Sequence, residues 1–176
     1  MSGHNKWSKI KHKKGAADAA RSKVFGKLAQ LIALESKKCC GNVDSPGLRS
    51  VIDRAKAASM PKSNIERAIV KGSGAEGANF EEVTYEAYGP GGVALIIEAI
   101  TDNKNRTTPE IRHILSKQGL ELAASGSATW AFTKGTDGYK SNSTTEISES
   151  DGEKLKKLLE IFDEHDDVQE VYTNAT

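Results

Sequence analysis

The sequence predicts an α+β protein, in which a basic module of three helices is joined to a two-layer α+β sandwich with a four-stranded sheet and two helices. Apolar residues recur at helical spacing before residue 70, and strand-like runs alternate with helix-like runs after residue 80. The charge also changes along the chain. Residues 1–75 hold 16 Lys and Arg against 5 Asp and Glu, and residues 76–176 hold 9 against 19. This difference predicts that the first part of the chain meets a polyanion.

The composition is that of a globular protein, with 37% apolar and 28% charged residues. No run of about 18 apolar residues predicts a transmembrane helix. No apolar signal-peptide core follows Met1, so we expect a cytoplasmic protein. Cys39 and Cys40 are adjacent, which gives neither a disulfide framework nor the spacing of a metal site. We therefore expect no metal ligands and no cofactor.

Three amphipathic helices are expected in a first domain, residues 1–71. The first helix should cover residues 15–38 and stop before Gly41. Its apolar stripe comprises Val24, Phe25, Leu28, Leu31 and Ile32. Ser45-Pro46 supplies the N-cap and the first residue of the second helix. Met60-Pro61 ends that helix and begins the third, so that three apolar faces can share one small core.

The segment 72–80 contains the pattern Gly72-x-Gly74-x-x-Gly77. In dinucleotide-binding folds this pattern follows a strand and precedes a helix. Here a helix precedes the pattern and a strand follows it. We therefore interpret residues 72–80 as a flexible linker between domains rather than as a nucleotide site.

A second domain, residues 81–176, begins with a strand over residues 81–88, in which apolar and polar residues alternate. The turn Gly89-Pro90-Gly91-Gly92 supplies a tight reversal of the chain. Residues 93–100 are the longest β-branched and aliphatic run of the protein and predict a buried central strand. Residues 102–106 then form a polar loop.

The next helix should begin at Thr108-Pro109 and end at Gly119. Residues 126–132 alternate in polarity and predict a third strand, with Trp130 in the core. Residues 133–149 have little apolar content and predict a mobile loop.

Two elements complete the predicted sandwich. Ser150 and Glu153 have the spacing of a capping box, which marks the start of the last helix. Residues 168–172 then form the fourth strand.

Residues 3–21, 57–69, 85–107 and 166–174 carry motifs that lie in order over nearly the whole chain. These motifs include Gly3-His4-Asn5-Lys6-Trp7, Met60-Pro61-Lys62-Ser63-Asn64, Tyr88-Gly89-Pro90-Gly91-Gly92-Val93 and Thr101-Asp102-Asn103-Lys104-Asn105-Arg106-Thr107. With them the chain resembles the YebC/PmpR family, whose mitochondrial member is the translational activator of cytochrome c oxidase subunit I.

The resemblance implies nucleic-acid binding and regulation of gene expression, either as a DNA-binding transcriptional regulator or as a translation factor at the ribosome. Members of the family usually carry a third domain, inserted between the third strand and the last helix of the second domain. A short polar segment, residues 135–149, stands in that place here. The third domain therefore looks absent.

Lysines bind phosphates as mobile point charges, and a Trp can stack on an unpaired base. The arm formed by residues 1–14 combines both residue types and contains no acid, although Trp7 could instead pack on the first helix. We predict nucleic-acid-binding residues in this arm, on the first helix and in the polar loop. They are Lys6, Trp7, Lys9, Lys11, His12, Lys13, Lys14, Arg21, Lys23, Lys27, Lys104 and Arg106.

The sequence favours a non-enzymatic translation factor that binds RNA or the ribosome over a DNA-binding transcriptional regulator. In residues 1–75 Lys exceeds Arg by 12 to 4, whereas readout of DNA base edges relies on Arg, Asn and Gln. No motif for a nucleophile, a bound nucleotide or a catalytic metal occurs, and His113 is expected at the surface or in packing. The acidic second domain is either a solvated surface or a contact for a basic protein partner.

Overall fold

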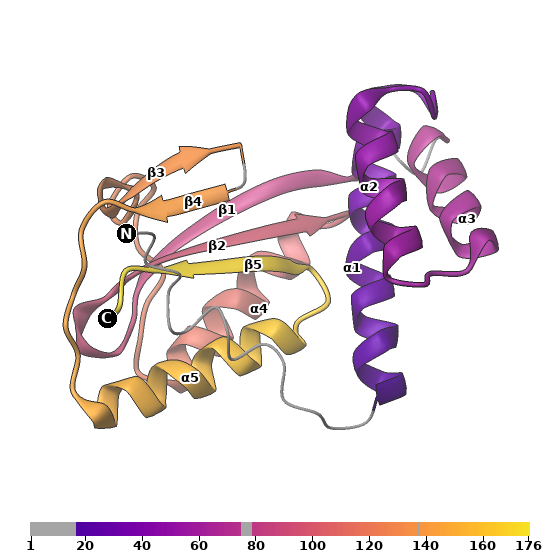
Figure 1. Ribbon diagram of the computed structural model, residues 1–176. Helices are drawn as coiled ribbons and strands as arrows, with labels where there is room; N and C mark the ends of the chain where they lie inside the picture. The colour runs from indigo at the N-terminus through magenta and orange to yellow at the C-terminus, as the bar shows by residue number, and fades with distance from the viewer. Residues whose placement is uncertain (1–16, 75–78, 137) are drawn as a thin grey trace. The chain divides into compact units, whose positions relative to one another are not determined.

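The computed structural model describes residues 17–74, 79–136 and 138–176 (Figure 1). These residues divide into two compact units, which are described separately. The helical unit comprises residues 17–83 and 100–107, and the sheet unit comprises residues 84–99 and 108–176. Helices and antiparallel sheets together place the chain in the predicted α+β class.

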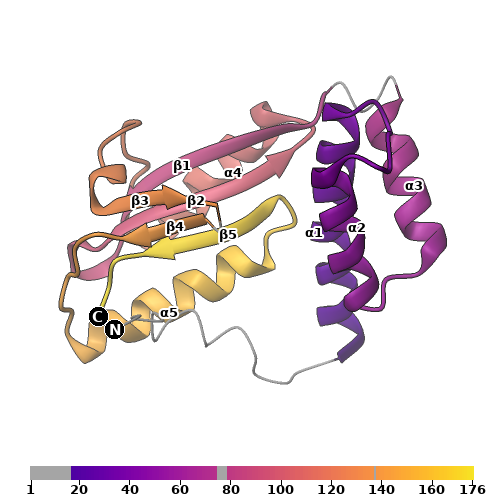
Figure 2. The same cartoon turned by 45° about the horizontal axis from the view of Figure 1, so that its top comes forward.

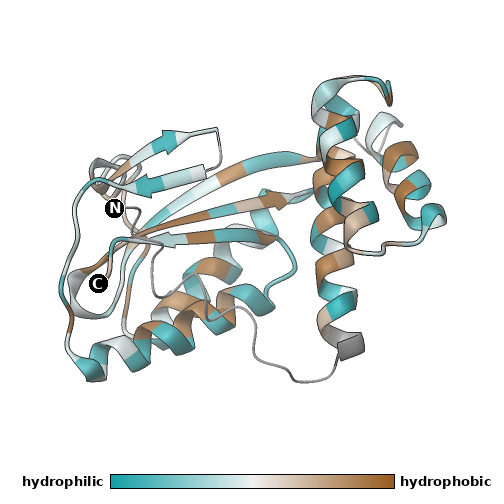
Figure 3. Cartoon of the chain, in the orientation of Figure 1, coloured by the Kyte–Doolittle hydropathy of each residue, from teal (hydrophilic) through white to brown (hydrophobic). Residues whose placement is uncertain are grey.

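The helical unit is built from α1 (Ala17–Lys38), α2 (Pro46–Ala57) and α3 (Lys62–Ser73). Hydrophobic and hydrophilic residues are interspersed along α1 (Figure 3). The three helices share one hydrophobic core, made of Leu28, Ile32, Leu48, Val51, Ile52, Ala55, Met60, Ile65 and Ala68. Three helices were expected here and are present. The predicted stripe of the first helix is correct only in part: Leu28 and Ile32 are buried and Phe25 and Leu31 pack against the core, but Val24 is 47% exposed. Pro46 is the first residue of α2, but the side chain of Ser45 makes no capping hydrogen bond.

Gly72 lies inside α3 and lets this helix approach α1 closely. A Cβ atom at Gly72 would lie 2.1 Å from the carbonyl oxygen of Ala33 and 2.7 Å from its Cα. Ser36 Oγ donates a hydrogen bond of 2.7 Å to the carbonyl of Ile69 across the same contact. The first glycine of the glycine pattern therefore serves helix packing, while residues 75–78 of the predicted linker lie outside the described residues.

The sheet unit contains a three-stranded sheet with the strand order β1-β2-β5. Its strands are β1 (Glu81–Tyr88), β2 (Ala94–Thr101) and β5 (Val168–Thr173), and a short 3₁₀ turn (η3, Pro90–Gly92) joins the first two. Strand β2 pairs antiparallel with β5, with Leu95 opposite Thr173 and Ile97 opposite Val171. The prediction of a buried central strand is confirmed, because every residue of β2 except Glu98 is buried.

Both faces of this sheet are covered within the sheet unit (Figures 1 and 2). Helices α4 (Lys104–Lys117) and α5 (Glu149–Glu164) lie on one face, and the hairpin of β3 (Phe132–Gly135) and β4 (Gly138–Ser141) lies on the other. Side chains of a strand alternate between its faces. Beneath the hairpin, Ala94 and Ile96 pack with Ala128, Ala131 and Phe132. Leu95 and Ile97 are fully buried on the opposite face.

The predicted four-stranded sheet is wrong. Residues 126–131 form turns and a 3₁₀ turn (η4, Thr129–Ala131), and β3 pairs only with β4. This segment forms a loop instead of a strand because its backbone N–H groups bind the buried carboxylate of Glu86. It accepts hydrogen bonds from the backbone N–H groups of Gly126 at 2.6 Å, Ala128 at 2.7 Å and Thr129 at 3.0 Å. An alternating sequence pattern cannot reveal such a partner.

The prediction that Trp130 belongs to the core is also wrong, because 61% of its surface is exposed.

The prediction of a loop over residues 133–149 fails in part, since β4 pairs with β3 there. Gly138 permits this hairpin to lie on the sheet: its φ is +102°, and a Cβ atom would lie 2.2 Å from Tyr172 Oη. Burial, followed by the nearby Glu98 carboxylate, raises the pKa of Tyr172.

Two predicted helix starts are displaced. Helix α4 begins at Lys104 rather than at Thr108, so Pro109 lies within the helix and residues 104–106 are not a loop. Helix α5 is capped by Ser148, which accepts from the Asp151 N–H at 3.1 Å, rather than by Ser150. The hydrogen bond from Ser148, followed by that from Lys154, lowers the pKa of Asp151.

The C-terminal end of α4 agrees with the prediction, because Gly119 follows it with a φ of +70°. Among the helices of the described residues, none has both the length and the apolar character needed to cross a bilayer.

We predict that Gly72→Ala destabilises the helical unit. Alanine is favoured over glycine in a helix by about 1 kcal/mol, but the clash with the Ala33 backbone should outweigh this gain and leave a net loss of about 2 kcal/mol. Gly26→Ala in α1 is the matched control, because no atom lies within 4 Å of its added Cβ. The control should gain about 0.5–1 kcal/mol. Urea denaturation followed by far-UV circular dichroism measures both; equal effects of the two substitutions would contradict the packing role.

We predict that Glu86→Gln lowers the free energy of unfolding of the sheet unit by about 2–3 kcal/mol, because three N–H donors lose a charged acceptor. Glu82→Gln on the same strand makes the same chemical change at an exposed position and should have little effect. Urea denaturation can be followed by Trp130 fluorescence in a Trp7→Phe background. Equal stability of the two variants would show that the Glu86 carboxylate does not hold the loop.

Candidate nucleic-acid interface

Most of the residues predicted to bind nucleic acid belong to the N-terminal arm. Lys6, Trp7, Lys9, Lys11, His12, Lys13 and Lys14 lie outside the described residues, so their role stays a prediction. The other predicted residues, on α1 and at the start of α4, all belong to the helical unit.

Three of the predicted cations lie on α1. Arg21 is exposed and has no polar partner among the described residues. Lys23 and Lys27 are half-buried, and each already contacts another group. Because one helical residue rises about 1.5 Å, these side chains are distributed over about 9 Å of the helix axis.

Two exposed arginines on α2 were not among the nucleic-acid-binding residues predicted from the sequence. Arg49 and Arg54 are exposed and lack a polar partner within the described part of the chain. The buried face of α2 comprises Leu48, Val51, Ile52 and Ala55. Arg49 and Arg54 could have been found from this pattern, because both fall between the buried positions.

Several other cations of the helical unit form ion pairs within one helix. Lys38 lies 2.6 Å from Glu35, Lys56 lies 3.7 Å from Asp53, and Lys62 lies 3.6 Å from Glu66. The lysine side chains in these pairs are 54–90% exposed. Exposed ion pairs of this kind contribute only about 0–1 kcal/mol, so a phosphate can replace the carboxylate at little cost.

The motif Thr101–Thr107 forms a structured helix start. The Oγ1 atom of buried Thr101 accepts the N–H of Asn103 at 2.9 Å and lies 2.8 Å from the Oγ1 of buried Thr107. Asn103 in turn accepts the N–H of Arg106 with its carbonyl at 3.0 Å. These contacts fix the first turn of α4, which the sequence pattern placed at Pro109.

The two predicted cations of this motif differ in their surroundings. Arg106 forms an ion pair of 3.3 Å with Asp102 and lies 3.5 Å from Thr101 Oγ1. Lys104 is exposed and has no polar partner among the described residues. Arg106 therefore supports the helix start, and Lys104 is the side chain more available to a ligand.

The motif is joined to the rest of the helical unit by a second apolar cluster. Ile100 packs with Ala33, Leu34 and Phe80. Lys37 Nζ donates to the Phe80 carbonyl at 2.8 Å, and Lys71 Nζ lies 5.0 Å from the centre of the Phe80 ring. These contacts bring Lys104 into the same compact unit as the cations of α1 and α2, although it is far from them in sequence.

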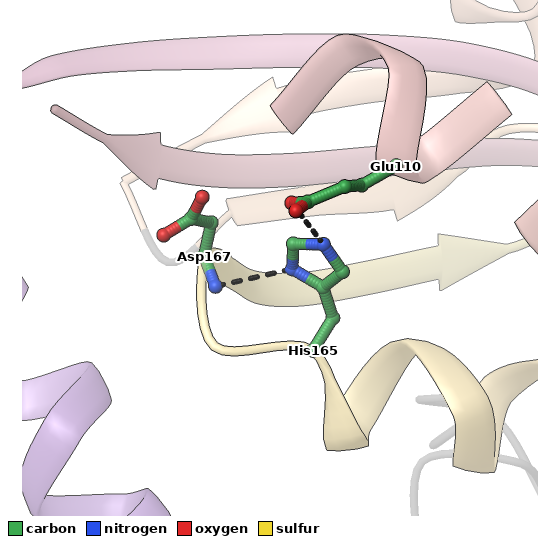
Figure 4. A group of neighbouring side chains, drawn as sticks. All are labelled: Glu110, His165 and Asp167. Atoms are coloured by element: carbon green, nitrogen blue, oxygen red, sulfur yellow. Dashed lines mark hydrogen bonds and ion pairs between the residues drawn. The ribbon is translucent and has the colours of Figure 1, made fainter. Parts of the chain in front are cut away.

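Glu110, His165 and Asp167 bring three potential metal ligands within 4.8 Å of one another in the sheet unit (Figure 4). The Asp167 N–H donates to His165 Nδ1 at 3.2 Å, so a neutral imidazole carries its proton on Nε2. Nε2 then donates to the Glu110 carboxylate at 3.2 Å. This network ties the end of α5 to α4 and accounts for both ring nitrogens. The expected absence of a metal stays a prediction, as does the role of His113, which is exposed.

Comparison with known sequences identifies the class of protein to which this fold and basic unit belong. The model of the TACO1/YebC protein N-terminal domain matches residues 5–75, and the model of the TACO1/YebC second and third domain matches residues 80–136 and 136–175. The chain belongs to the TACO1/YebC family.

Relatives match over nearly the whole chain. A protein of Fervidobacterium nodosum is 40% identical over 99% of this chain and 93% of its own length, and one of Petrotoga mobilis is 48% identical over 98% and 70%. Both are named "probable transcriptional regulatory protein". The crystal structure of a conserved hypothetical protein from Aquifex aeolicus is similar with a TM-score of 0.88 and 34% identity, covering 98% of this chain and 97% of that one.

Proposed function

We propose that this chain is a non-enzymatic, nucleic-acid-binding regulator of gene expression that acts in translation by binding RNA or the ribosome. The observation that carries the proposal is the charge of residues 1–75, with 16 Lys and Arg against 5 Asp and Glu. A polyanion gains affinity from each cation that replaces its condensed counterions. Family membership supports a regulatory role, because relatives are named as probable transcriptional regulators.

The structure of the helical unit is consistent with such an interface. Arg21, Arg49, Arg54 and Lys104 are exposed and lack polar partners among the described residues, and three exposed lysines form only weak ion pairs. We include these four cations with the arm residues in the proposed interface. A lysine-rich surface suits the irregular phosphate array of folded RNA, which is recognised by its shape.

The second candidate is a DNA-binding transcriptional regulator. The names of the relatives favour it. Arg49 and Arg54 on α2 favour it as well, because arginine is the side chain that most often contacts guanine in the major groove. The excess of Lys over Arg, 12 to 4 in residues 1–75, favours the RNA reading. Direct comparison of RNA and duplex DNA at equal salt separates the two.

We further propose that residues 1–71 and 81–176 act as two domains and that this chain lacks the third domain between residues 135 and 149. The hairpin β3–β4, residues 132–141, overlaps the start of this segment. The alignment with the Fervidobacterium protein extends over 235 positions, more than the 176 residues of this chain, which supports an internal deletion. Apart from Lys104 and residues 126–145, the acidic second domain is proposed to repel nucleic acid and to contact a basic protein partner.

We predict that replacing Lys11, Lys13 and Lys14 by Glu weakens binding to a structured RNA and flattens its salt dependence. The slope of log K against log salt should fall by about 0.7–0.9 for each phosphate contact that is lost. Fluorescence anisotropy with a labelled RNA hairpin, and with duplex DNA of matched length, measures both quantities across a salt series.

The control for this triple variant carries the same charge change elsewhere. Lys117, Lys156 and Lys157 lie on α4 and α5 of the sheet unit. Their replacement by Glu should leave the salt slope unchanged. If the arm variant kept the wild-type slope, or if the control lost as much, the proposed interface would be refuted.

A further inference from the structure

The sheet unit exposes two aromatic side chains beside each other, Trp130 and Tyr88. Trp130 is 61% exposed and Tyr88 is 38% exposed, whereas Phe132 and Phe162 of the same unit are buried. Trp130 Nε1 donates a hydrogen bond of 3.2 Å to Tyr88 Oη. The one polar atom of the indole therefore has a hydrogen-bond partner within the chain, and the rest of this exposed side chain consists of carbon atoms.

This aromatic pair is held in place by buried structure. Tyr88 Oη donates to the carbonyl of Ser127, which belongs to the same loop as Trp130. The Glu86 carboxylate, 5% exposed, accepts N–H groups from both sides of Ser127 and from Thr129. Beneath the loop, Ala128 and Ala131 are fully buried against the sheet. The exposed indole thus needs little ordering on binding, and this lowers the entropic cost of a contact.

The surroundings of the pair suit a nucleic acid better than an apolar protein segment. Residues 126–145 contain two lysines and one acid, although the second half of the chain is strongly acidic. Lys140, opposite Thr133 in the hairpin, is exposed without a polar partner among the described residues. Tyr88 Oη contacts the Ser127 carbonyl, and polar Thr129 precedes Trp130 in the chain. A protein partner would require a broader apolar patch, whereas a single base requires one ring face.

We propose that Trp130, supported by Tyr88, is a stacking platform for an unpaired RNA base. The platform is a second contact, separate from the cations of the helical unit, and it rests on the proposed function of RNA binding. Stacking on an aromatic face tolerates any base, so the platform contributes affinity for single-stranded segments rather than sequence specificity.

The test uses Trp7→Phe, in which Trp130 is the one remaining tryptophan of the sequence. Fluorescein-labelled and unlabelled single-stranded oligoadenylate are the probes. We expect the oligonucleotide to quench Trp130 fluorescence at the concentrations at which anisotropy reports binding. Trp130→Ala should lose about tenfold in affinity, which corresponds to about 1.4 kcal/mol and lies within the range of one stacked base. Trp130→Phe should retain most of the affinity, because it keeps an aromatic face.

Ile161→Ala is the matched control, since it truncates an apolar side chain that is 38% exposed on α5. Its affinity should stay at the wild-type value. Binding by anisotropy without quenching, or equal losses in Trp130→Ala and Ile161→Ala, would overturn the stacking platform while leaving RNA binding intact. Absence of any RNA binding would overturn both. If Trp130→Ala kept its affinity for the oligonucleotide but no longer associated with ribosomes, Trp130 would be assigned to a protein contact. That result would also overturn the proposal.

Discussion

Burial of β2 on both faces is the constraint on which the sheet unit depends. Its aliphatic side chains are removed from solvent only if each face of the strand is covered by another layer of the structure. Each covering layer is held by its own set of contacts. Helices α4 and α5 cover one face. The hairpin β3–β4 covers the other face. Gly138 allows this because it has no Cβ atom that would clash with Tyr172. The Glu86 carboxylate holds the loop before the hairpin through three backbone hydrogen bonds. The same loop then presents Trp130 to solvent.

A functional division follows from the distribution of charge. The helical unit buries a small apolar core and leaves cations such as Arg49, Arg54 and Lys104 exposed, whereas the sheet unit carries most of the acidic residues. Long-range attraction and repulsion would orient a polyanion toward the first part of the chain. A stacking aromatic in a segment of the sheet unit with a single acid, residues 126–145, adds a contact that charge alone cannot supply.

Sequence periodicity predicted the elements whose burial follows one simple repeat. The three helices of the basic module and the central strand β2 were found in this way, and the glycine after α4 was found from the preference for glycine at a helix end. The missed features depend on partners far away in sequence or on competing local signals. Pro109 is a strong start signal, but the contacts of Thr101 and Thr107 begin the helix earlier. Trp130 has the spacing of a strand residue, but Glu86, more than forty residues before it, turns the segment into a loop.

The candidate site was predictable only in part. Clustered lysines, and the charge difference between the two halves, are visible in composition, and they led to the arm and to α1. Arg49 and Arg54 required the helical face of α2 to be considered, and the exposure of Trp130 required the three-dimensional structure. The distinct surroundings of Lys104 and Arg106 likewise arise from side-chain contacts that spacing does not encode.

Co-sedimentation with ribosomes across a salt series, run beside duplex DNA binding at the same salts, tests the central claim most directly. The account predicts that ribosome association survives near-physiological salt, because many weak contacts on a folded RNA act together, while binding to duplex DNA collapses. Tight duplex binding that resists competitor DNA, with no ribosome association, would contradict a role in translation and favour a transcriptional regulator.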